Sequence, residues 1–168
     1  MAQDPIWGNL FRKKEGWVSV ASELCALNPL FDRFTPSVID WIVGNASLRH
    51  FKSGESIFRM GDEGAGALLL LSGQVSIQTG GKELASVEQG DLFGEVALLP
   101  DQYRTADAIA TQDCEILFFL RSEISEWKEN HPKQAYRLME NLAKMLSKRL
   151  LEKNKIQSAA CNKDNQHL

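Results

Sequence analysis

The chain has 168 residues, of which 43% are hydrophobic and 24% are charged, and its formal net charge is −3. This length suits one domain with extensions, and it is enough to bury a core without disulfides or metals. The mild negative charge argues against nucleic-acid binding through a broad basic surface. The longest apolar runs, residues 67–71 and 116–120, are too short to cross a bilayer, so no membrane span is expected.

The cysteine and histidine residues do not form a recognisable chemical site. Cys25, Cys114 and Cys161 are far apart and odd in number, which favours a reducing cytoplasm over a disulfide framework. The N-terminus lacks the charged and apolar regions of a signal peptide. No cysteine or histidine has the spacing of a metal site, and no nucleophile stands beside a base. We therefore expect a cytoplasmic protein that is not an enzyme and binds no metal.

The N-terminal segment is expected to be an arm followed by a helix. Residues 1–16 mix apolar side chains with basic ones, as in a short amphipathic helix or a loose segment. Such an arm packs on its own domain, or docks on a partner or a membrane surface. From Trp17 to Leu27, apolar residues recur at helical spacing. This helix should end near Asn28-Pro29, because proline disfavours helical geometry in the residue before it.

A second helix is predicted from Thr35 onwards. Thr35 can cap the helix, and Pro36 suits its first position. Apolar residues continue the helical pattern over 38–43, and Gly44-Asn45 supplies a stop. Two helices are thus expected before the first strand.

From about residue 48 to residue 120, short β-rich runs alternate with glycine turns. Turn signals at roughly 7–12-residue spacing between short strands are typical of an antiparallel sandwich or barrel. Residues 75–78 and 84–87 alternate on either side of Gly80-Gly81, which predicts a hairpin. Residues 115–120 form a final strand. The predicted fold class is mainly β: an antiparallel β-roll or jelly roll with N-terminal helices and a long C-terminal helix.

The C-terminal region is predicted to be helical. Ser122 is expected to cap a helix that His131-Pro132 breaks. A long helix should follow from Lys133 to about Ile156. Residues 158–168 are polar and are expected to form a flexible tail.

These expectations divide the chain into an arm at 1–16, a domain at 17–157 and a tail at 158–168. Within the domain, the roll occupies about 48–120 and the C-terminal helices 122–157. The apolar stripe of the long helix covers about two heptads, fewer than a confident coiled coil needs. Packing on its own roll and formation of a homodimer therefore both remain open.

The stretch FGEVALLPDQYRTA, residues 93–106, carries the pattern of an anion site. A single helical turn that begins at Gly94 would leave the backbone N–H groups of residues 95–97 free. Arg104, just beyond the turn, has a planar fork that suits a phosphate, and Thr105 adds a hydroxyl.

Glu95 has a different role in this pattern, because a carboxylate accepts hydrogen bonds and does not bind phosphate. Its chemistry suits a sugar hydroxyl, so the stretch would hold a sugar phosphate or a nucleotide. The alternative is a structural ion pair between Glu95 and Arg104 that braces the turn.

The same residues resemble the phosphate-binding cassette of cyclic nucleotide-binding domains. That cassette has Phe-Gly-Glu, a small apolar helix, and Arg followed by a small residue and Ala, with the arginine nine positions after the glutamate. The glycine turns upstream are similar to the family's as well. The resemblance covers roughly residues 24–155 and rests on these segments: 27–31, 52–64, 71–75 and 93–106.

The resemblance implies a site for cyclic AMP or cyclic GMP. Glu95 would accept a hydrogen bond from the ribose 2′-hydroxyl, and Arg104 would pair with the cyclic phosphate. The remaining implied residues provide close backbone approach and amides (Gly94, Val96, Ala97), a hydroxyl (Thr105), and a lining for the base (Ile77, Ala85, Val87). The sequence departs from the family at Asp107, where Thr, Ser or Val is commoner, and in the loop 100–103, which lacks a frequent glycine.

Two functions are compatible with this sequence. The first is a receptor that binds a cyclic nucleotide, moves its C-terminal helix and signals to a protein partner in trans. The second is a ligand-independent interaction or dimerisation module with a degenerate site, which Asp107 and the missing glycine favour. DNA binding is not expected, because the residues after Ile156 cannot form a recognition helix.

Overall fold

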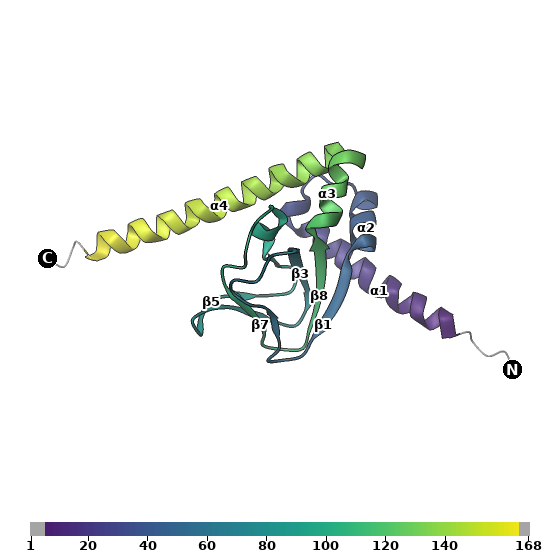
Figure 1. The fold of residues 1–168 in the computed structure, drawn as a ribbon, viewed down its shortest axis with the longest axis horizontal. Helices are drawn as coiled ribbons and strands as arrows, with labels where there is room; N and C mark the ends of the chain where they lie inside the picture. The colour runs from purple at the N-terminus through teal and green to yellow at the C-terminus, as the bar shows by residue number, and fades with distance from the viewer. Residues whose placement is uncertain (1–5, 165–168) are drawn as a thin grey trace.

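The computed structural model describes the backbone of residues 6–164 and the side chains of residues 16–155. Helices precede and follow a β-roll, and the last helix runs out across one end of the roll (Figure 1). The strands within this part of the chain are β1 (Ser47–Phe51), β2 (Ser56–Phe58), β3 (Gly66–Ser72), β4 (Val75–Thr79), β5 (Lys82–Val87), β6 (Leu92–Phe93), β7 (Asp107–Ala110) and β8 (Cys114–Leu120).

The roll consists of two antiparallel four-stranded sheets, which confirms the predicted fold class. One sheet has the order β1-β8-β3-β6 and the other the order β2-β7-β4-β5. Strand β3 is fully buried along almost its whole length, because one of its faces meets the helices and the other meets the second sheet. The predicted hairpin is formed by β4 and β5, with Ile77 opposite Ala85. Gly80 and Gly81 turn it with φ angles of 57° and 76°, which glycine adopts without strain.

The N-terminal helices end where the sequence predicts. Helix α1 (Ile6–Leu27) stops before Asn28, whose side chain accepts a hydrogen bond from the N–H of Leu30 in the short helix η1 (Pro29–Phe31). Helix α2 (Pro36–Asn45) begins after Thr35, which occupies the cap position, but its side chain makes no cap hydrogen bond. Helix α1 also runs across the boundary that we expected between an arm and the domain.

The C-terminal helices differ in detail from the prediction. Helix α3 (Arg121–Asn130) has Leu120, not Ser122, at its cap position. The Glu123 carboxylate accepts a hydrogen bond from the N–H of Leu120, which satisfies the start of the helix two residues earlier than predicted. Helix α4 (Pro132–Asp164) begins at the second residue of the predicted break, one residue before the expected Lys133. It extends beyond the predicted end near Ile156, into the segment that was expected to be a tail.

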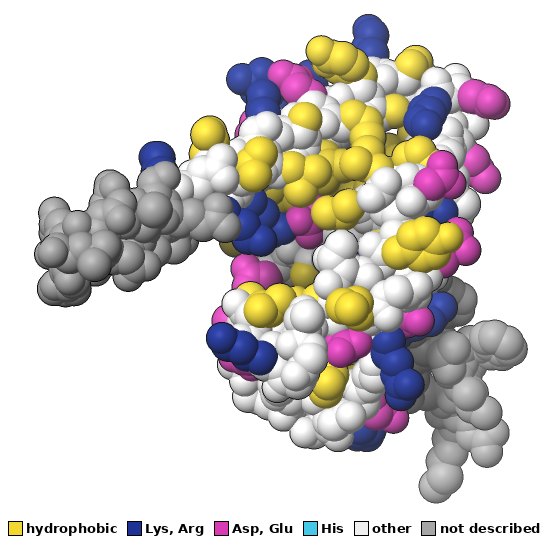
Figure 2. All heavy atoms as spheres, turned by 60° about the vertical axis from the view of Figure 1, so that its left-hand side comes forward, with side chains coloured by type: hydrophobic (Ala, Val, Ile, Leu, Met, Phe, Trp, Pro, Cys, Tyr) yellow, Lys and Arg dark blue, Asp and Glu magenta, His cyan; other side chains and the backbone are white. Residues whose placement is uncertain are grey.

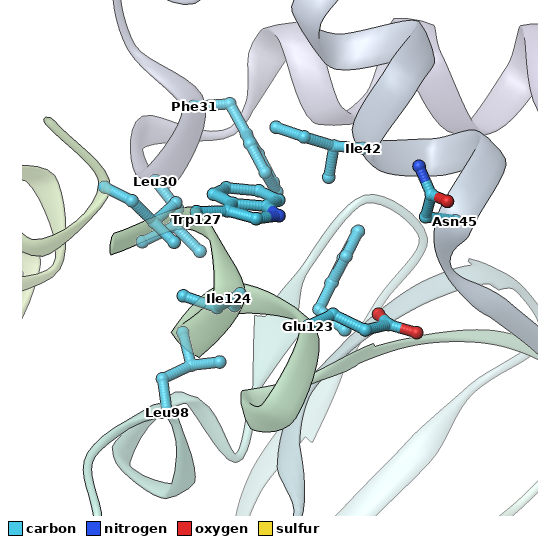
Figure 3. Close-up of a pocket in the computed structure, with 10 residues that line it drawn as sticks. Leu30, Phe31, Ile42, Asn45, Leu98, Glu123, Ile124 and Trp127 are labelled. Atoms are coloured by element: carbon cyan, nitrogen blue, oxygen red, sulfur yellow. The ribbon is translucent and has the colours of Figure 1, made fainter. Parts of the chain in front are cut away.

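The helices share one apolar core with the roll. Phe31, Ile42, Trp127 and Leu138 are buried together against β3 and β8. A void of about 20 Å³ remains between η1, α2 and α3, and Figure 3 shows Trp127 and Ile124 beside it. This volume is about that of one water molecule, so the void is not a ligand site. The apolar stripe of α4 contributes Leu138, Leu142, Met139, Met145 and Leu146 to this core, whereas Leu150 and Leu151 are exposed.

Candidate functional site

A large cleft lies between α4 and the roll, with a volume of about 1270 Å³. Sites for small molecules are usually about 300–1,000 Å³, so the cleft has room for a nucleotide and remains open to solvent. The β4–β5 hairpin, residues 91–97, residues 103–106 and α4 supply its walls. Figure 2 shows this hollowed side of the molecule, where hydrophobic side chains gather next to charges of both signs.

The cleft brings together all nine residues that the sequence singled out. Three come from the hairpin and six from the stretch between β6 and β7. They are Ile77, Ala85, Val87, Gly94, Glu95, Val96, Ala97, Arg104 and Thr105. Residues that are distant in the sequence thus form one surface.

The stretch after β6 folds as a short 3₁₀ helix, η2 (Glu95–Leu98). Gly94 precedes it in the left-handed conformation, with φ 63° and ψ 19°. The expectation of three free amides requires a correction, because the N–H of Ala97 donates to the carbonyl of Gly94 at 3.2 Å. In a 3₁₀ helix the N–H groups before that point, those of Glu95 and Val96, have no acceptor within the helix.

Arg104 is held rigidly although its side chain carries a charge. Its Nη1 donates to the carbonyl of Gly94 at 2.9 Å and its Nη2 to the carbonyl of Gly66 at 3.0 Å. The guanidinium also lies over the ring of Phe58, 4.2 Å from its centroid. Burial lowers the pKa of Arg104, and the carboxylates of Asp62 and Glu95 oppose this shift. An arginine has five N–H donors, so these two bonds leave three for another acceptor.

Glu95 does not form the bracing ion pair with Arg104 that the sequence left open. Its side chain is only 6% exposed and pairs with Arg149 of α4. Nη2 of Arg149 also approaches the carbonyl of Leu92, at 3.4 Å. Arg149 therefore contacts residues on both sides of Gly94, namely Leu92 before it and Glu95 after it.

The sequence did not identify Arg149, Phe58, Tyr103 or Leu84 as part of this surface, yet all four line the cleft. The spacing of the apolar residues of α4 could have pointed to Arg149. Buried Leu138 and Leu142 and half-buried Met145 follow helical spacing, and the next position on that face is residue 149. An arginine at an otherwise apolar position indicates a specific partner.

Asp107 does not face the cleft. Its Oδ1 accepts a hydrogen bond from the N–H of Met60 at 2.8 Å, and it is absent from the cleft lining. Alternation along one strand would put residues 105 and 107 on the same face, but β7 begins at Asp107 and Thr105 precedes the strand.

Within residues 16–155, no group of three or more histidine, cysteine or acidic side chains is arranged to hold a metal ion. Among the helices of the described chain, none combines the length and hydropathy that crossing a membrane requires.

Comparisons with known proteins agree with this geometry. Residues 48–131 match the family model of the cyclic nucleotide-binding domain. The chain is 35% identical over 130 residues to the cyclic AMP receptor protein of Thermus thermophilus, covering 74% of this chain and 58% of that protein. It is 35% identical over 88 residues to a cAMP-dependent protein kinase regulatory subunit of Hypocrea atroviridis, covering 52% of this chain and 19% of that protein.

A solved structure has the same fold. The crystal structure of the Thermus thermophilus catabolite activator protein superposes with a TM-score of 0.68 at 32% identity, covering 78% of this chain and 62% of that one. The chain therefore spans less than two thirds of each of these relatives.

Proposed function

The chain belongs to the cyclic nucleotide-binding domain family, and we propose that it is a receptor for cyclic AMP or cyclic GMP rather than an enzyme. One observation carries the proposal: the cleft presents a buried carboxylate and a buried guanidinium on either side of one glycine turn. The guanidinium keeps three unused donors, and apolar strand residues lie on the same surface. A nucleotide has the matching groups, namely a hydroxylated sugar, an anionic phosphate and a planar base.

Each part of the ligand has a complementary partner in this proposal. The cyclic phosphate takes the remaining donors of Arg104, the amides of Glu95 and Val96, and the Thr105 hydroxyl. The ribose 2′-hydroxyl donates to Glu95. The base lies on Ile77, Ala85 and Val87, with Gly94 and Ala97 allowing close approach of the backbone.

The receptor would signal through α4. A ligand changes the position of this helix only if it binds one position more tightly than the other. We propose that the moving helix acts on a protein partner in trans in the cytoplasm. A homodimer through α4 is also proposed, because Leu150 and Leu151 leave apolar surface exposed. Light scattering with and without nucleotide tests it, and a strict monomer in both states excludes it.

Asp107 and the missing loop glycine favoured a ligand-independent module, and each has another explanation. Asp107 is engaged outside the cleft by the N–H of Met60. In the loop 100–103, which lacks a glycine, Asp101 itself adopts a positive φ of 56°. Aspartate tolerates this left-handed conformation better than most residues.

A thermal melt with cyclic AMP and cyclic GMP tests the receptor. A ligand at a hundredfold its Kd should stabilise the protein by about 2.7 kcal/mol. Arg104→Leu should abolish the shift, and Thr105→Ala, at an exposed position, should reduce it without affecting the fold. Arg49→Leu is the matched control, since Arg49 lies over Phe118 and outside the cleft. If neither nucleotide shifts the wild-type melt at millimolar concentration, the proposed function is wrong.

A further inference from the structure

The carboxylate that would accept the ribose already has a partner on α4. Glu95 pairs with Arg149, whose side chain is 49% exposed. The second nitrogen of the same guanidinium approaches Leu92 O in β6. One arginine of α4 thus bridges the turn on which the proposed ligand would sit.

Another part of α4 is attached separately, nearer its start. Asn141 donates both hydrogens of its amide to the carbonyls of Leu30 at 3.0 Å and Asp32 at 2.9 Å. Arg137 donates to the carbonyl of Arg33 at 2.6 Å. These bonds fix α4 to the segment around η1. The contact at Arg149 lies about two helical turns further on, beyond Met145 and Leu146, which pack on the core. It is therefore the outermost of these attachments of α4.

From this arrangement we propose that Arg149 is a latch that ligand binding releases. This latch rests on the proposed function and on competition for one atom: the ribose hydroxyl takes Oε1 of the buried Glu95 carboxylate, the oxygen that Arg149 now occupies. When the hydroxyl takes the place of Arg149, Glu95 keeps a hydrogen-bond partner and α4 loses its outer attachment. The ligand therefore frees the outer half of the helix from the roll.

The energetics permit this exchange. A buried carboxylate left without any partner is strongly unfavourable, so Glu95 requires one donor or the other. The guanidinium is half in solvent, so water compensates its charge when the pair opens, and the cost of opening falls on the buried Glu95. A latch of this kind holds α4 in place but yields to a ligand that also gains contacts elsewhere in the cleft.

The latch predicts that one substitution in the cleft strengthens nucleotide binding instead of weakening it. If Arg149 competes with the ligand, Arg149→Ala removes the competitor and nucleotide binding becomes tighter. The expected gain is about tenfold in Kd for a site that is open in roughly one molecule in ten. Arg149→Met, which keeps an unbranched apolar side chain but has no N–H donor, provides the same test if the alanine variant does not fold. Lys155→Ala removes a cation of α4 outside the cleft lining, and its Kd should match the wild type.

Isothermal titration calorimetry with cyclic AMP and cyclic GMP measures these constants. Tighter binding by both Arg149 variants, with Lys155→Ala unchanged, supports the latch. Unchanged or weaker binding by the Arg149 variants overturns it, because Arg149 would then be either a bystander or a direct ligand contact.

A second measurement needs no ligand and separates failure of the latch from failure of the proposed function. Spin labels at Lys82→Cys on the exposed β5 and Leu151→Cys on α4, in a Cys161→Ser background, report the distance across the cleft. Cys25 and Cys114 are buried. Arg149→Ala and Glu95→Gln should each broaden the distances, and combining them should add nothing further. If nucleotides bind but these distances do not change, the latch is wrong and the receptor stands. If no variant binds nucleotide, the receptor and the ribose exchange both fail.

Discussion

A Cβ atom on residue 94 would lie 2.3 Å from Nη1 of Arg104, closer than atoms can approach without displacement. The glycine therefore serves two purposes at once. It adopts the left-handed conformation that starts η2, and it makes room for the guanidinium that donates to its own carbonyl. The turn and the arginine are a single structural unit.

Gly94→Ala should consequently abolish the nucleotide-dependent thermal shift while lowering stability only moderately. The methyl group forces Arg104 out of its position over Phe58, and the left-handed backbone adds a strain of about 1 kcal/mol. Differential scanning fluorimetry with and without nucleotide measures both effects.

Gly54→Ala is the matched control for that substitution. Gly54 also has a positive φ, of 88°, but no atom lies within 4 Å of a Cβ built there. Its backbone strain should be similar, and its ligand response should be retained. Equal loss of the response in both variants would show that strain, not the contact with Arg104, is responsible.

The ring of Phe58 is expected to hold the guanidinium of Arg104 in its position. A cation over an aromatic ring contributes about 0.5–2 kcal/mol, depending on how far it is removed from water. Phe58→Leu should therefore weaken nucleotide binding by about fivefold, corresponding to about 1 kcal/mol. Phe51→Leu removes another half-buried ring, stacked on Phe118 outside the cleft, and should leave Kd unchanged in the same titration. Equal affinities for all three proteins would contradict this role.

Asp107 should affect stability and not binding. Its Oδ1 accepts the N–H of Met60, and loss of such a bond costs about 1 kcal/mol. Asp107→Ala should lower the melting temperature, whereas Asp107→Asn, which retains an acceptor oxygen, should be close to the wild type. Both should show the wild-type Kd. Tighter binding by both variants would mean that the charge of Asp107 reaches the phosphate after all.

The features that could be predicted from the sequence are those that a short segment determines by itself. Turn chemistry and proline within a few residues account for the Gly80-Gly81 hairpin, the start of α2 at Pro36 and the end of α1 before Asn28. Glu95, Arg104 and the glycine turn stand out in a local pattern, whereas Ile77, Ala85 and Val87 were named through the resemblance to the family.

The features that were missed depend on contacts between distant segments or on small changes of register. The partner of Glu95 is 54 residues away, on a helix whose path over the roll no local pattern specifies. Ser122 is a good cap residue, but Glu123 satisfies the start of α3 from within the helix. The sequence did not show that Asp107 lies outside the cleft, because this depends on β7 beginning two residues after Thr105.

The buried Cys25 thiol should make the stability of the protein depend on pH in the alkaline range. Its side chain is fully buried among apolar residues, and this burial raises its pKa from 9.0 to about 12. In the unfolded chain the thiol ionises near 9, whereas in the folded protein it stays neutral to about 12. Its contribution to stability is therefore complete below pH 9 and is lost as the pH rises from 9 towards 12.

The free energy of unfolding should accordingly fall more steeply with pH in the wild type than in Cys25→Ala. The difference in slope between the two proteins should approach 1.4 kcal/mol per pH unit above pH 9, since one additional proton is released on unfolding. Urea titrations under reducing conditions from pH 7.5 to about pH 10.5 measure it. The alanine variant is less stable throughout because of its cavity, but that offset does not depend on pH. Parallel curves for the two proteins would show that the Cys25 thiol ionises in the folded state as readily as in water.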